Sequence, residues 1–170
     1  MIQAARLLAE EDASWRAICE VFERVPSDRF EEPALTPDGW SPKDAMFHVA
    51  GWMADCASHL EAMRLGVARV TEETRETIER QNQAWFEMSR TMSPVLVRQR
   101  FDESRHRMVE AFGAFAEPSP EAVEWFEESG VLHHRKHIAD LERFLSGERG
   151  RAHPSRASTA SRRRGPRPLR

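Results

Sequence analysis

The stretch GWSPKDAMFHVAGW, residues 39–52, contains the best-marked helix start in this chain of 170 residues. Ser41 occupies an N-cap position, Pro42 the first helical position, and Asp44 follows three residues after the cap, which is typical of a capping box. Apolar residues then recur at helical spacing as far as Gly66, a candidate C-terminal cap. This pattern predicts a long helix with one apolar face.

The same periodicity extends on both sides of this stretch. Tyr is absent and β-branched residues are sparse, a composition that favours helix. Ser129-Gly130 is expected to kink or split the last helix, because glycine destabilises a helix interior. We therefore expect an all-α protein, a four-helix bundle over residues 1–146. Besides the helix above, the apolar spacing predicts helices over roughly residues 2–24, 72–91, 94–115 and 121–145.

The formal net charge of −3 is the sum of two unlike parts. Residues 1–147 carry 17 basic and 27 acidic side chains, a net of −10, whereas residues 148–170 carry eight Arg and only Glu148, a net of +7. The segment 147–170 is rich in Arg, Ser, Gly and Pro, and we expect it to be a disordered tail. We do not expect the protein to bind nucleic acid: only this tail could do so, and a solubilising extension is the simpler interpretation.

Targeting signals are not evident in the sequence. The N-terminal residues have no basic region followed by an apolar run, and the most apolar window, residues 45–54, is too short to span a bilayer. Cys19 and Cys56 lack the spacing of a disulfide framework or a CxxC motif. We expect a cytoplasmic protein that does not contact the membrane.

Three histidines stand where the helical pattern calls for core residues. His133 and His137 are four residues apart, so their imidazoles can converge on one metal ion, although two hydrogen-bonded or partly exposed histidines would fit the same spacing. His48 lies in the most apolar helix, one turn from Asp44 and from Trp52. Asp44 is a candidate partner for the second nitrogen of His48, but capping its own helix is the simpler role.

Asn82 lies between Ile78 and Trp85 at helical spacing, on the side that we expect to be buried. A buried amide needs a hydrogen-bonding partner. Two interpretations stay open: a structural bond across the bundle, or a place in the lining of a polar pocket beside the metal.

The remaining candidates carry weaker signals. His59 falls three turns after His48, too far along the helix to share an ion. We expect His134 and His106 to face outward or to flank the pocket. Glu11, on the apolar face of the first helix, is the candidate for a fourth ligand.

Residues 39–52 resemble the W-S-x-x-D-x-x-x-H-x-x-x-W motif of the DinB/YfiT-like metalloproteins. Asn82 falls where those proteins often place an Asn, and His133 and His137 match their closing H-x-x-x-H. The resemblance implies an up-down-down-up four-helix bundle whose metal ligands are His48, His133 and His137. The superfamily includes mycothiol-dependent maleylpyruvate isomerase metal-binding domains, bacillithiol transferases and the ClbS/DfsB branch.

The sequence departs from the family pattern in two places. His134 stands where the family often has Tyr, and the link over residues 66–72 is short, spanning at most about 23–25 Å, for the crossover that the family shows.

The resemblance implies a metal-dependent enzyme, with one divalent ion, zinc or nickel. A low-molecular-weight thiol such as mycothiol or bacillithiol would be activated for transfer to, or isomerisation of, a small electrophilic molecule. Asn82 would then be catalytic, and Trp52 and Trp85 would contact the cofactor. The alternatives are a metal-dependent hydrolase of ClbS/DfsB type and a non-catalytic metal-binding bundle that forms a homodimer, although three protein ligands favour an open, catalytic site over a closed structural one.

Overall fold

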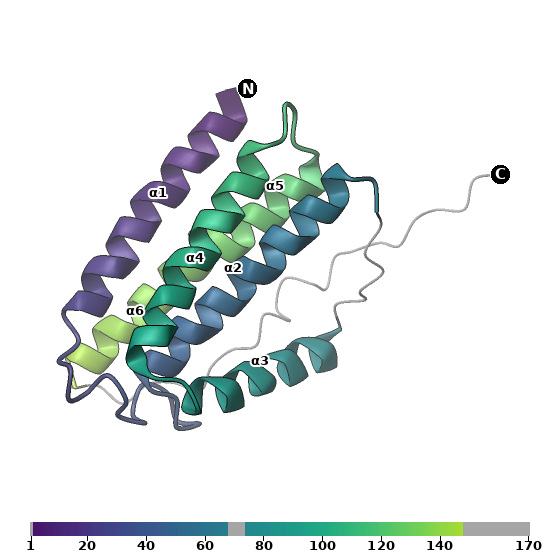
Figure 1. Cartoon of the computed structure of the whole chain (residues 1–170). Helices are drawn as coiled ribbons and strands as arrows, with labels where there is room; N and C mark the ends of the chain where they lie inside the picture. The colour runs from purple at the N-terminus through teal and green to yellow at the C-terminus, as the bar shows by residue number, and fades with distance from the viewer. Residues whose placement is uncertain (1, 68–73, 148–170) are drawn as a thin grey trace.

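The computed structural model describes residues 2–67 and 74–147, and all regular elements in these ranges are helical (Figure 1). The all-α expectation is confirmed, and the helix limits agree closely with the predicted ranges. Of the tail predicted over 147–170, all but Gly147 lies outside the described residues. The elements are α1 (Ile2–Glu23), α2 (Pro42–Arg64), α3 (Arg75–Arg90), α4 (Pro94–Gly113), α5 (Pro120–Glu127), the π-helical turn η1 (Glu128–Leu132) and α6 (His133–Leu145).

Helix α2 is at the centre of the arrangement. It lies along α4, while α1 lies along α6 and η1 (Figure 1). α2 and α4 run in the same direction, and the chain returns from the end of the first to the start of the second along α3, which packs against α2. α3 therefore serves as the crossover, and the link predicted over residues 66–72 lies, apart from residues 66 and 67, outside the described residues.

The start of α2 is fixed by the capping box that the sequence predicts. The Ser41 hydroxyl accepts a hydrogen bond from the Asp44 backbone amide at 3.2 Å, and the Ser41 amide donates to the Asp44 carboxylate at 2.8 Å. Ser89, at the end of α3, donates its hydroxyl proton to the other oxygen of Asp44. The cap therefore also holds the end of α3 against the start of α2.

The end of α2 also follows its prediction. Gly66 has a φ of +68°, in the left-handed region that favours glycine. Its amide donates to the Met63 carbonyl at 3.0 Å, and the Val67 amide donates to the Ala62 carbonyl at 2.9 Å. These two bonds form a Schellman motif, which satisfies the last carbonyls of the helix.

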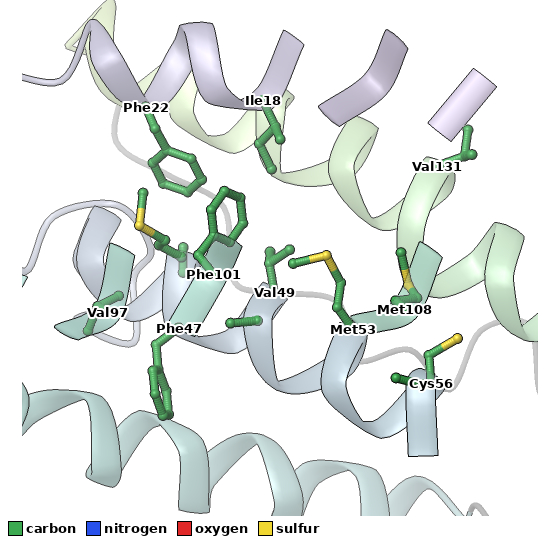
Figure 2. Close-up of a cluster of buried hydrophobic side chains, with 14 of the residues drawn as sticks. Ile18, Phe22, Phe47, Val49, Met53, Cys56, Val97, Phe101, Met108 and Val131 are labelled. Carbon is green, nitrogen blue, oxygen red and sulfur yellow. The ribbon is translucent and has the colours of Figure 1, made fainter. Parts of the chain in front are cut away.

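The hydrophobic core joins α1, α2, α4 and η1. Figure 2 shows the side chains that meet between these elements: Ile18, Val49, Met53, Met108 and Val131. All five are fully buried. Interiors packed in this way hold their side chains in defined rotamers. The middle of α2 is therefore a rigid platform for any side chain placed on it.

The expected break in the last helix is present as η1. This turn separates α5 from α6, and π-helical turns of this kind often occur at functional sites. Gly130 permits a close approach here, because a Cβ at this position would lie 3.2 Å from both Glu11 Cγ and Met108 Cε. No helix within the described ranges is long and apolar enough to cross a membrane.

Candidate metal centre

The three predicted histidines converge in the structure. His48 projects from the middle of α2, His133 is the first residue of α6, and His137 follows one turn later. The Nε2 atom of His133 lies 3.0 Å from Nε2 of His48 and 3.0 Å from Nε2 of His137. Within the described residues, these three form the one group of potential ligands whose donor atoms all lie within 4.8 Å of one another.

The spacing of these nitrogens fits a single metal ion. Two nitrogens held about 2.0–2.1 Å from zinc, at an angle between about 90° and 110°, are separated by about 2.9–3.4 Å. A neutral imidazole presents either a proton or a lone pair at Nε2, but Nε2 of His133 faces two other ring nitrogens. One divalent cation at their common point would accept all three lone pairs at once.

The burial of the cluster is uneven. His48 and His137 are each 1% exposed, whereas His133 is only half buried. Burial lowers the pKa of His137, although nearby Asp140 acts in the opposite direction, so the neutral, metal-binding form is favoured. The centre therefore has a closed side within the core and an accessible side next to His133.

Asp140 supports the cluster from the next turn of α6. Its Oδ2 atom lies 3.4 Å from Nδ1 of His137, and its other oxygen accepts a hydrogen bond from Arg143. A carboxylate on the outer nitrogen of a ligating histidine orients the ring and raises its basicity. The sequence analysis missed this residue, although its position three after His137 is a readable signal.

Three tryptophans surround His48. The ring centroids of Trp40, Trp85 and Trp52 lie 5.0, 6.1 and 6.5 Å from that of His48, and all three rings meet it edge to face. Trp52 and Trp85 thus lie beside the three histidines, and their contact with a cofactor stays a prediction. Trp40 was not assigned to the site in advance, because it precedes α2 in a loop whose path the sequence does not define.

Asn82 is buried and lies next to this aromatic wall. Its side-chain oxygen accepts a hydrogen bond of 3.0 Å from the indole nitrogen of Trp52. This bond across the bundle agrees with the structural interpretation of the buried amide. The catalytic role of Asn82 stays a prediction.

Gly51 allows α3 to come close to this wall. A Cβ at Gly51 would lie 2.5 Å from Cε2 of Trp85, so the absence of a side chain admits the indole onto α2. Trp85 is the residue that makes this close approach.

The expectation that His134 faces outward is wrong, because this side chain is buried in the core. It is 0% exposed, its Nδ1 lies 3.0 Å from the Ser14 hydroxyl, and its ring lies against Trp15 of α1. Burial, with smaller effects of His137 and Arg105, lowers its pKa to about 3. His134 therefore joins α6 to α1, a quarter turn away from the metal centre.

Glu11 is not a fourth ligand in this structure. It is 0% exposed, but both of its carboxylate oxygens accept hydrogen bonds from Arg105, at 3.2 and 2.9 Å. Burial raises the pKa of Glu11 despite this partner. Glu11 of α1 therefore forms an ion pair with Arg105 of α4.

The other histidines that the structure describes, and both cysteines, lie outside the centre. His59 stacks on Trp125 at 4.2 Å between ring centroids, and the His106 side chain is 86% exposed. Burial raises the pKa of Cys19 to about 12, and Cys56 is fully buried, which leaves neither thiol suited to nucleophilic attack.

Comparisons of the chain with protein-family models, with curated proteins and with solved structures found no match. The function therefore has to be argued from the centre itself and from the motif in residues 39–52.

Proposed function

We propose that this protein is a metal-dependent enzyme of the DinB-like superfamily, in which one divalent ion activates a small thiol for transfer to, or isomerisation of, a small electrophilic molecule. The observation that carries the proposal is the convergence of His48, His133 and His137 at spacings suited to one ion. The thiol and the family are supported by the resemblance of the motif that contains His48.

The number and burial of the ligands favour a catalytic centre over a structural one. Structural zinc usually takes four protein ligands, whereas a three-ligand site leaves a position for an exogenous molecule. The half-buried His133 marks the side from which a substrate can enter. A divalent ion held here would supply Lewis acidity, lowering the pKa of a bound thiol.

The residues around the ligands have separable roles in this proposal. Asp140 orients the ring of His137, so the ligand is held ready before the ion binds. Trp40, Trp52 and Trp85 exclude water from three sides of His48, which strengthens electrostatic interactions inside the site. Asn82 holds the indole of Trp52 in place through its side-chain oxygen.

Metal analysis of the purified protein tests the first half of the proposal. We expect one zinc or nickel ion per chain, with binding lost in His133→Ala and kept in the matched control His106→Ala, whose histidine is exposed. Saturation at a hundred times the dissociation constant would stabilise the fold by about 2.7 kcal/mol. Absence of stoichiometric metal, together with an unchanged melting temperature in His133→Ala, would overturn the metal centre.

The second half needs a thiol assay. The metal-loaded protein should accelerate the consumption of mycothiol or bacillithiol by an aryl halide, and His133→Ala should not. A protein that binds metal but leaves the thiol reaction at its uncatalysed rate would retain the metal centre and refute thiol transfer.

A further inference from the structure

A cavity of about 340 Å³ lies between α2, α3 and α4, on a different face of α2 from the metal ligands. This volume is at the lower end of the range for small-molecule sites, enough for a compound of one or two rings. Its lining includes Phe47, Gly51 and Ala54 of α2, Trp85 and Met88 of α3, and Arg100 of α4.

The cavity is separate from the histidine cluster. On a helix with 3.6 residues per turn, Phe47, Gly51 and Ala54 share one face, which is rotated by about a quarter turn from the face of His48. Trp85 lines the cavity and also lies 6.1 Å from His48, measured between ring centroids. The indole of Trp85 is thus the common wall of the two sites.

The apolar part of the lining suits a flat, apolar molecule. The Phe47 ring extends towards α3 in Figure 2, so it is directed to this side of α2. Trp85 adds a second aromatic surface to the lining, and Met88, also in the lining, is 48% exposed. Aromatic side chains attract other rings in stacked or edge-to-face geometry, and methionine sulfur adapts to irregular shapes.

The charges at the cavity indicate a single negative charge on the ligand. Arg107 is already neutralised, because it donates two hydrogen bonds to Glu61 at 2.9 and 2.6 Å. Arg100 is exposed and forms no ion pair with any acidic side chain in the parts of the chain that the structure describes. Asp55 lies in the same lining and repels a dianion such as a phosphate monoester more strongly than a monoanion.

We propose that this cavity binds a small aromatic monocarboxylate, with its ring between Phe47 and Trp85 and its carboxylate on Arg100. An arginine guanidinium matches a carboxylate in a two-pronged hydrogen bond, so the acid should bind better than a neutral compound of the same shape. This site goes beyond the proposed activity, since none of its contacts involves a metal ligand.

Calorimetric titration with 2-naphthoate and its neutral analogue 2-naphthylmethanol tests the proposal. Arg100→Gln should weaken binding of the acid by about fivefold or more, and that of the alcohol by less than twofold. Arg80→Gln is the matched control, because Arg80 is exposed on α3 and outside the lining. Ala54→Leu should fill the cavity and abolish binding of both compounds without changing the urea midpoint.

Three results would overturn the proposal. The first is a wild-type protein that does not bind the acid at millimolar concentration, and the second is equal weakening by Arg100→Gln and Arg80→Gln. The third is a requirement for metal: binding that disappears after chelation or in His133→Ala would place the acid at the histidine cluster. Unchanged binding in His133→Ala supports the separate cavity even if that variant loses its metal.

Discussion

Replacing Gly51 with alanine tests how closely α3 is held against α2. In a regular helix this substitution is favourable by about 1 kcal/mol, because glycine is a poor helix former. In this structure the new methyl carbon would lie 2.5, 2.6 and 2.9 Å from three ring carbons of Trp85. The substitution therefore has two opposing effects on stability: a gain from helix propensity and a loss from the steric clash with Trp85.

The clash should decide the result. Contacts between carbon atoms are normally about 3.5–4.0 Å, so the rigid indole would have to move by about 1 Å. Overpacking of this kind typically costs about 1–3 kcal/mol, which exceeds the propensity gain at most values in that range. We expect Gly51→Ala to lower the free energy of unfolding by about 1 kcal/mol net.

A urea titration followed by circular dichroism measures this change, and a double-mutant cycle assigns its cause. In a Trp85→Ala background the clash is absent, so Gly51→Ala should become stabilising by up to about 1 kcal/mol. Gly113→Ala is the control, since nothing lies within 4 Å of a Cβ built there. Stabilisation by Gly51→Ala in the wild-type background would show that α3 does not press on α2 as described.

Two further predictions concern the partners of buried carboxylates and imidazoles. Arg105→Met should destabilise the fold by about 3 kcal/mol, because it leaves Glu11 charged and buried. Burial raises the pKa of Glu11, so this loss should shrink as the pH falls and Glu11 takes up a proton. A loss independent of pH in urea titrations would contradict the assignment. Asp140→Asn should weaken zinc binding by about tenfold to a hundredfold, measured by competition with a chromogenic chelator, because His137 loses its orienting carboxylate. Asp102→Asn is the control, because Asp102 is exposed. Equal zinc affinities of the two variants would show that Asp140 does not support the metal centre.

Much of the helical content and of the histidine cluster was predictable from the sequence because the signals are local. A capping box is confined to four residues around Ser41, and the H-x-x-x-H spacing of His133 and His137 needs only a helix to bring the two rings together. His48 became a candidate through its apolar neighbours. Each of these inferences depends on residues within about two turns of one another.

The predictions failed for residues whose contacts are with parts of the chain far away in the sequence. His134 follows His133 directly, and the preceding π-helical turn changes the phase of the helix, so the sequence pattern does not say which imidazole faces which partner. The partner of Glu11 is 94 positions away, on α4. Spacing rules describe one helix at a time, and such pairings depend on how two helices pack.

The position of α3 links these observations. Three contacts at successive levels hold it on α2: Ser89 with the Asp44 cap, Trp85 with Gly51, and Asn82 with Trp52. The last two border the metal centre, and Trp85 also forms a wall of the cavity. Because one helix carries side chains of both sites, a shift of α3 that opens the cavity must also move the aromatic wall around His48. The two sites therefore cannot change shape independently unless Trp85 rotates on its own, and Gly51 leaves it little room to do so.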